Sequence, residues 1–230
     1  MGAHGIRRTV AVVAVATGCL VLAACTMPVT SAPGQAVSPS PGQLVAAFYG
    51  DSYTRGTGAS SPEHRWSSIV AAERGWFEFN PSVDGLGYVI NRGFAPGGDL
   101  VGQIVDHDPP PDVVIVTMGL NDAFLTSAEA EDLEAAIRAD FERFREELPD
   151  SRLVVVEPFW HQEERPSSLR RIIGWVRDAA ADVGADHIAG ASRWIEGHPE
   201  WMSADTVHPN DEGYAEIARR MSSGLERLGL

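Results

Sequence analysis

From Leu44 onward, short apolar runs alternate with longer segments in which apolar residues recur every three or four positions. Two of the short runs, Val113 to Thr117 and Leu153 to Glu157, begin with four consecutive apolar residues that are mostly β-branched. Uninterrupted runs of this kind are typical of strands covered on both faces, as in parallel sheets. The pattern predicts five strands: Leu44 to Tyr49, Trp76 to Phe79, Val113 to Thr117, Leu153 to Glu157 and Asp186 to Ile188.

The longer segments predict the helices that connect these strands. In the clearest of them, Leu133, Ile137, Asp140 with Phe141, and Phe144 form one face, while Glu and Arg fill the other. Ser127 and the acids that follow it are suited to cap the start of this helix. The predicted helices are Pro62 to Arg74, Asp99 to Val105, Ala128 to Glu147, Ser167 to Ala181 and Asp211 to Leu228. Strands that alternate with helices predict an α/β fold with one mainly parallel five-stranded sheet and helices on both faces.

Length and charge limit the number of domains and the functions that the chain could have. The 230 residues suffice for one domain with a sizeable core, and no internal repeat or second domain is visible. A formal net charge of −14 without a basic cluster argues against nucleic acid as a partner. All 18 basic residues are Arg, so mechanisms that need a lysine amine are excluded.

The N-terminal segment has the pattern of an export signal. Residues 1–24 carry Arg7 and Arg8 and then an apolar stretch that ends at Cys25. The sequence Leu22-Ala23-Ala24-Cys25 resembles the lipobox of bacterial lipoproteins, which implies cleavage before Cys25 and lipidation of its thiol; an ordinary signal peptide with a chance cysteine is the alternative. Residues 25–42, rich in Pro and Ser, predict a tether, and 43–230 the folded domain. We therefore expect a protein outside the cytoplasm, anchored to the bacterial cell membrane.

Three loops that carry polar side chains follow strands or precede the last helix. They are Gly50-Asp51-Ser52-Tyr53, Gly119-Leu120-Asn121-Asp122 and Asp205-Thr206-Val207-His208. Ligands of open α/β sheets bind where strands end, so these loops are expected to meet at one edge. A serine hydroxyl becomes a good nucleophile when an imidazole takes its proton, and the imidazole needs a carboxylate to fix its tautomer. Each motif alone is also consistent with an ordinary turn or cap.

Taken together, these loops resemble the conserved blocks of the SGNH (GDSL-like) hydrolases, and the resemblance covers nearly all of Leu44 to Leu230. It implies a three-layer, flavodoxin-like α/β fold and ester hydrolysis that needs neither a cofactor nor a metal. By the same resemblance Ser52 is the nucleophile, His208 the general base and Asp205 its orienting acid. Asn121 and the Ser52 amide are oxyanion-hole donors. Tyr53 stands where the family usually has Leu.

The resemblance also implies a glycine amide as the third oxyanion donor. Gly85 fits best because Asn80 to Gly85 directly follows the second strand, whereas Gly97 and Gly98 come later and fit less well. A plain turn glycine is the alternative for Gly85. Asp51 and Asp122 are interpreted as scaffold residues whose carboxylates accept hydrogen bonds from loop amides.

Two other classes of protein remain open. A metal-dependent phosphoesterase would use Asp51, Asn121, Asp122, Asp205 and His208 as ligands, but the remaining histidines lack metal-ligand spacing. A lipid-anchored binding module could keep the fold without catalysis. No obligate protein partner is inferred.

The substrate is the least determined part of the hypothesis. Aromatic and apolar residues near the strand ends either line a cleft or pack in the core: Phe124, Phe159, Trp160, Trp201 and Met202. We expect a small-molecule or glycan ester with a short acyl group, such as acetyl on a carbohydrate or cell-envelope compound. A lipase, lysophospholipase or thioesterase is the alternative.

Overall fold

A five-stranded parallel sheet forms the centre of the structure, a computed structural model that describes residues 1–2, 38–95, 99–125, 130 and 132–230. The strands lie in the order β2-β1-β3-β4-β5, and every neighbouring pair is parallel. Their bounds are β1 (Val45–Tyr49), β2 (Phe77–Phe79), β3 (Val113–Val116), β4 (Arg152–Val156) and β5 (Asp186–Ile188). All five predicted strands are confirmed, each within one residue at either end.

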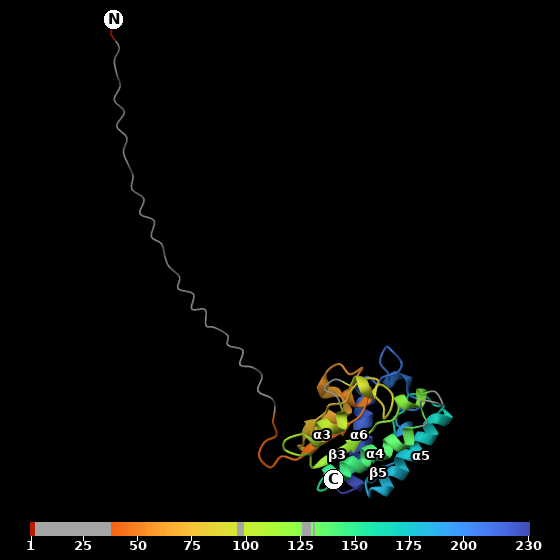
Figure 1. Cartoon of the computed structure of the whole chain (residues 1–230). Helices are drawn as coiled ribbons and strands as arrows, with labels where there is room; N and C mark the ends of the chain where they lie inside the picture. The colour runs from red at the N-terminus through yellow and green to blue at the C-terminus, as the bar shows by residue number, and fades with distance from the viewer. Residues whose placement is uncertain (3–37, 96–98, 126–129, 131) are drawn as a thin grey trace. The chain divides into compact units, whose positions relative to one another are not determined.

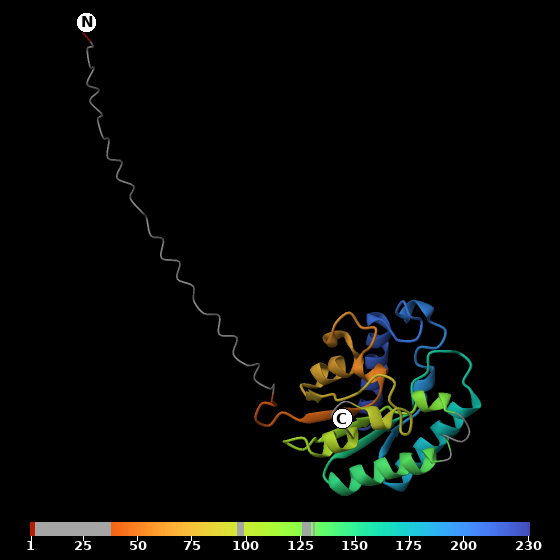
Figure 2. The same ribbon diagram turned by 45° about the horizontal axis from the view of Figure 1, so that its top comes forward.

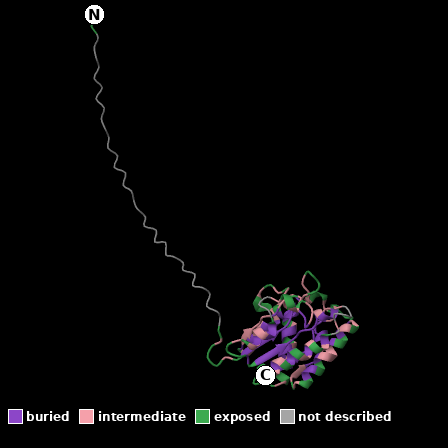
Figure 3. Cartoon of the chain, in the orientation of Figure 1, coloured by how far each residue is buried: buried purple, intermediate pink, exposed green. Residues whose placement is uncertain are grey.

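Helices cover both faces of the sheet. Helices α2 (Trp66–Arg74) and α6 (Asp211–Arg227) pack together on one face (Figures 1 and 2). On the other face α4 (Leu133–Glu147) lies between α3 (Leu100–Val105) and α5 (Ser167–Asp182). The three central strands β1, β3 and β4 are almost entirely buried (Figure 3), because they face a helical layer on each side, whereas the edge strands β2 and β5 are partly exposed. The predicted three-layer α/β fold is thus confirmed.

Two predicted helix starts are wrong. The segment Pro62–His64 forms a separate 3-10 turn, and the extended backbone of Arg65, with ψ at 149°, interrupts the chain before α2 begins. Helix α4 begins at Leu133, where Asp132 is its N-cap, rather than at Ala128. Ser127, the predicted cap, lies outside the described residues.

The compact unit runs from Ser38 to Leu230 and contains every element described above. Cys25 and the predicted signal sequence lie outside the described residues, apart from residues 1–2. In the part of the chain that the structure describes, every helix is too short or too polar to cross a membrane.

Candidate active site

Ser52 lies directly beyond the carboxyl end of β1, as the first residue of the one-turn helix α1 (Ser52–Arg55). Asp51 caps this helix, since its Oδ1 accepts a hydrogen bond from the Tyr53 amide at 3.0 Å. The sequence predicts a tight turn here but not the helical turn that follows it. Because the first amides of a helix have no intrahelical acceptor, the Ser52 N–H stays available at this position.

Ser52, His208 and Asp205 form a continuous chain of hydrogen bonds, although 156 residues separate the serine from the histidine. The distance from Ser52 Oγ to His208 Nε2 is 2.9 Å, and His208 Nδ1 lies 2.6 Å from Asp205 Oδ2. A carboxylate beside Nδ1 keeps the proton on that nitrogen, which leaves Nε2 free to accept the serine proton. The sequence analysis predicts that these three residues act together, and the structure places them within hydrogen-bonding distance.

The Asp205 carboxylate is held by several donors of its own turn. Its Oδ1 accepts hydrogen bonds from the Val207 and His208 amides, each at 2.9 Å, and from the Ser203 hydroxyl at 2.8 Å. Burial by itself would raise the pKa of Asp205, but these donors and His208 hold the pKa well below its ordinary value. Asp205 is therefore a carboxylate throughout the neutral range, as the partner of an imidazole must be.

A cavity of about 480 Å³ opens at Ser52 and His208, and both Gly85 and Asn121 line it. Asn121 Nδ2 donates to the Leu86 carbonyl at 2.8 Å and lies 3.4 Å from the Asp51 carboxylate, so the amide group is held at the cavity wall. The structure thus brings the predicted oxyanion donors to the same cavity as the serine. Gly97 and Gly98, the alternatives to Gly85, lie outside the described residues.

The loop that follows Gly85 is fastened by the buried carboxylate of Asp122. Its oxygens accept hydrogen bonds from three consecutive amides, those of Tyr88 at 2.8 Å, Val89 at 3.0 Å and Ile90 at 3.2 Å. A Cβ atom at Gly87 would overlap this carboxylate, so only glycine permits the approach. The contacts confirm the interpretation of Asp122, and of Asp51 above, as scaffold residues.

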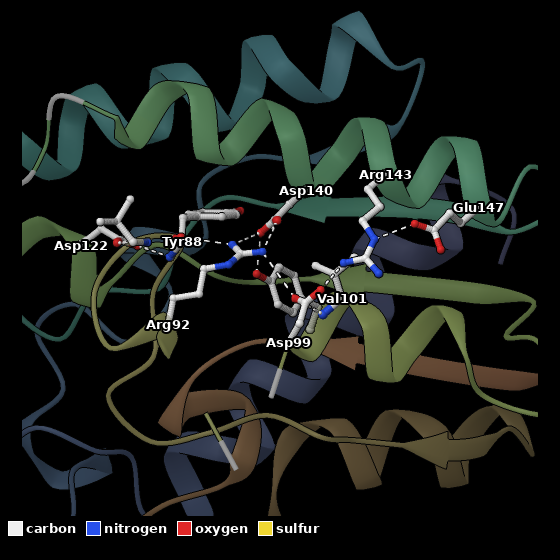
Figure 4. A network of polar contacts seen from close by, with 10 residues as sticks. Tyr88, Arg92, Asp99, Val101, Asp122, Asp140, Arg143 and Glu147 are labelled. Atoms are coloured by element: carbon white, nitrogen blue, oxygen red, sulfur yellow. Dashed lines mark hydrogen bonds and ion pairs between the residues drawn. The ribbon is translucent and has the colours of Figure 1, made fainter. Parts of the chain in front are cut away.

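A second group of polar contacts fixes the far end of the same loop (Figure 4). Arg92 reaches the Tyr88 carbonyl at 3.1 Å and makes a two-pronged ion pair with Asp140 of α4, at 2.7 and 2.5 Å. The buried Tyr49 hydroxyl at the end of β1 donates to the same carboxylate at 2.6 Å. Asp140, which the sequence places on the apolar face of its helix, is thus buried because it pairs with a cation and a phenol.

We expect Asp140→Ala to lower the free energy of unfolding by about 2–4 kcal/mol, because it leaves the Tyr49 hydroxyl and part of the Arg92 guanidinium unpaired. Urea denaturation measures the change. The matched control is Asp178→Ala, which removes an exposed pair with Arg177 and should cost less than about 1 kcal/mol. Equal losses in the two variants would contradict the structural role of Asp140.

The buried Asp51 carboxyl gives the protein a specific pH dependence. Burial is the main cause that raises its pKa to about 7, and the nearby Asp122 adds to the shift. Since an unfolded Asp ionises near pH 4, the folded state holds a proton between about pH 4 and 7 that the unfolded chain lacks. This contribution to stability is complete below pH 4 and is lost as the pH rises through 7.

Asp51→Asn cannot ionise and so should lack this loss. We expect the free energy of unfolding of the variant, minus that of the wild type, to rise by about 2–4 kcal/mol between pH 4 and 8. Urea denaturation at four or five pH values measures it, and the pH dependence of other carboxylates cancels in the difference. Parallel stability curves would show that Asp51 does not titrate in this range.

His161 also lines the Ser52 cavity, and the sequence analysis missed it. It lies four residues beyond the end of the predicted fourth strand. Because ligands of open α/β sheets bind beyond the carboxyl ends of the strands, this position could have been predicted to line the site. Of the candidate aromatic residues, Phe124 lines the cavity, Phe159 and Trp160 are buried in the core, and Trp201 stacks on His198. Most of these side chains are therefore packing residues.

The described carboxylates of the site accept hydrogen bonds from backbone amides or face His208, and they do not converge on a common point as metal ligands would. Among the described residues, no group of three or more His, Cys, Asp or Glu side chains is placed to hold a metal ion. Asp51 and Asp122 receive loop amides, and Asp205 faces His208. The arrangement can accept a proton from a serine hydroxyl and can place amide donors around a developing negative charge.

A three-layer α/β fold with this hydrogen-bonded serine at the carboxyl edge of its sheet defines a serine ester hydrolase of the SGNH type. The sequence model of the GDSL-like lipase/acylhydrolase family matches residues 48–216. The chain belongs to this family. The expected family and enzyme class are thereby confirmed.

Individual proteins agree with this assignment. The chain is 31% identical to the GDSL lipase Rv0518 of Mycobacterium tuberculosis over 192 residues, which cover 76% of this chain and 79% of the relative. A family two carbohydrate esterase from Clostridium thermocellum, solved with cellohexaose, superposes with a TM-score of 0.63 at 18% identity, covering 84% of this chain and 67% of the esterase. A two-domain esterase active on acetylated mannans superposes with a TM-score of 0.60 at 18% identity, covering 81% of this chain and 50% of that esterase. At such identities the two solved structures show a common fold.

Proposed function

We propose that Ser52 is the nucleophile of this hydrolase, with His208 as its general base and Asp205 as the acid that orients the histidine. The single observation that carries the proposal is the hydrogen-bonded chain from Ser52 Oγ through His208 to Asp205. As Oγ attacks the ester carbon, its proton passes to His208 Nε2, and the carbonyl π electrons move onto oxygen. Asp205 stabilises the imidazolium that forms.

The oxyanion of the tetrahedral intermediate then faces the Ser52 amide, the Gly85 amide and the Asn121 side-chain amide. His208 returns its proton to the leaving alcohol oxygen, the C–O bond breaks, and an acyl group remains on Ser52. A water molecule, deprotonated by His208, repeats the sequence and releases the acid. Each donor of this kind is worth about 10²–10³ in kcat in serine hydrolases.

For the substrate we propose a short acyl group, acetyl in particular, on a carbohydrate or cell-envelope compound. Two of the structural neighbours support this choice, since one was solved with cellohexaose and another is active on acetylated mannans. A second candidate is an ester with a longer acyl chain. Apolar side chains of Leu120, Phe124 and Val207 in the cavity wall favour it, as does the relative described as a lipase.

A panel of p-nitrophenyl esters from acetyl to palmitoyl, run beside acetylated oligosaccharides and with Ser52→Ala as background, separates the two candidates. A kcat/KM that is highest for acetyl and for acetylated glycans supports the first. A kcat/KM that rises steadily toward long chains refutes it in favour of the second.

We also propose that the mature chain begins at Cys25 and is lipidated there, which would tether the enzyme outside the cytoplasm. The support is the sequence Leu22-Ala23-Ala24-Cys25 after an apolar stretch. Mass spectrometry of the N-terminal peptide from the native host should give Cys25 with a diacylglyceryl group. An unmodified Cys25, or cleavage elsewhere, would overturn the proposal.

A further inference from the structure

A second cavity, of about 300 Å³, lies next to the Ser52 cavity. Its walls include His161, Ile195, His198, Met202 and Thr206. His161 lines both cavities. We call this second space the His161–Met202 cavity.

The Asp205–His208 turn also takes part in both walls. Thr206 lines the His161–Met202 cavity, whereas Val207 and His208 line the Ser52 cavity. Thr206 has a left-handed backbone conformation, with φ at 60°, where the turn passes from one cavity wall to the other. The proposed catalytic turn therefore borders both spaces.

The order of the strands places the two cavities along the edge of the sheet. Gly85 follows β2, Ser52 follows β1 and Asn121 follows β3, while His161 follows β4 and Ile195 follows β5. The oxyanion donors thus come from the β2, β1 and β3 side. The His161–Met202 cavity lies over the β4 and β5 side.

The chemistry of ester cleavage assigns different directions to the parts of the substrate. In the tetrahedral intermediate the carbonyl oxygen must point to the oxyanion donors, and the leaving oxygen must lie near His208 Nε2, which protonates it. The alcohol portion therefore extends away from Gly85 and past His208. That direction leads along the strand order to His161.

On the basis of the function proposed above, we propose that the His161–Met202 cavity binds the alcohol portion of the substrate, a carbohydrate, while the Ser52 cavity receives the acyl portion. The alcohol cavity has apolar wall residues in Ile195, Pro199 and Met202 and hydrogen-bonding groups in Glu163 and Thr206. Sugar rings present apolar C–H faces together with hydroxyl edges, so such a mixed wall suits them.

His161 lies where the two cavities meet, since it lines both. Burial is the main cause that lowers its pKa, and the neighbouring His208 lowers it further against an opposing effect of Asp205, which favours the neutral imidazole. Its Nε2 faces the Gln162 side-chain amide at 3.1 Å, which places the proton on Nδ1. Among the described residues this buried Nδ1 has no hydrogen-bond partner. Because this atom is buried, His161 borders the two cavities without presenting this N–H to a ligand.

The test compares esters that differ in one portion only. Ethyl acetate and acetylated xylo-oligosaccharides share the acetyl group, whereas ethyl acetate and ethyl octanoate share the alcohol. Met202→Trp fills the His161–Met202 cavity with a larger side chain. Glu163→Trp does so from an exposed position, where a substitution is expected to leave the fold undisturbed. The matched control, Phe124→Trp, changes the wall of the Ser52 cavity instead.

We expect both cavity-filling variants to lower kcat/KM for the acetylated oligosaccharides at least about tenfold and to keep ethyl acetate hydrolysis within about twofold. Phe124→Trp should change the ratio of ethyl octanoate to ethyl acetate and leave the oligosaccharide to ethyl acetate ratio unchanged. Parallel losses on all three esters would overturn the assignment, because they would indicate a structural effect.

Two further outcomes would also overturn it. A selective loss on ethyl octanoate in Glu163→Trp would place the acyl portion in this cavity. If the wild type cleaves ethyl acetate but no glycan ester, the proposal that the alcohol portion is a carbohydrate is refuted. Failure of the proposed function is recognised separately, since Ser52→Ala would then keep its ethyl acetate activity.

Discussion

Ser52→Ala is expected to lose at least about 10⁴-fold in kcat on p-nitrophenyl acetate while it folds as the wild type does. The hydroxyl that forms the acyl bond is gone, and His208 Nε2 then has no serine proton to accept at 2.9 Å. His208→Gln should lose about as much, because a side-chain amide cannot take up the proton. Initial rates with purified variants, beside circular dichroism and urea denaturation, measure both parts of the expectation.

A buried serine elsewhere provides the control for this result. Ser151 donates its hydroxyl to the Pro111 carbonyl at 2.5 Å, before β4 and away from the cavity. Ser151→Ala should lose stability of about 1 kcal/mol and no more than about threefold in activity. A folded Ser52→Ala that keeps more than about one hundredth of the wild-type rate would contradict the nucleophile assignment.

Asp205→Asn is expected to lower kcat by about 10²–10⁴ with little change in KM. The Val207 and His208 amides and the Ser203 hydroxyl all donate to Oδ1, so the asparagine keeps its carbonyl oxygen on that side. Its NH₂ group then faces His208 Nδ1 and donates to it. This interaction selects the tautomer with the proton on Nε2, which cannot accept the serine proton.

The expected loss in kcat spans a wide range because the side chain of Asp205 is half-exposed. At such a position the side-chain amide of the variant can also rotate and bind water. Asp211→Asn is the matched control, because Asp211 also lies near a histidine, with its carboxylate 3.5 Å from His64 Nδ1. It should leave kcat within about twofold. An Asp205→Asn variant with more than a tenth of the wild-type kcat would show that the carboxylate does not control the tautomer.

The central strands β3 and β4 could be predicted because their side chains face helices on both sides and therefore leave an uninterrupted, mostly β-branched pattern. The helix starts were harder, since they depend on single backbone angles such as the extended ψ of Arg65. The one-turn helix at Ser52 is too short for any periodicity to appear. Asp140 did leave a visible sign, as an acid on an apolar helix face.

The residues of the candidate site could be recognised because each lies in a segment that follows a strand or precedes the last helix. The contacts between them could not be recognised. Tyr53 illustrates this limit. It takes the place of the usual leucine, and its hydroxyl donates to the Val207 carbonyl at 2.5 Å, across 154 residues of sequence, while its ring stacks on Phe159. Nothing local in the sequence indicates that this tyrosine joins the serine's helix to the histidine's turn.

The most direct test of the account is to identify the residue that carries the acyl group during turnover. The enzyme is mixed with excess p-nitrophenyl acetate, quenched in acid within the first turnovers, digested and analysed by mass spectrometry. The account predicts an acetyl group on the peptide at Ser52, and none on the corresponding peptide of Ser52→Ala. An acyl group on another residue, or turnover by Ser52→Ala at the wild-type rate, would contradict it.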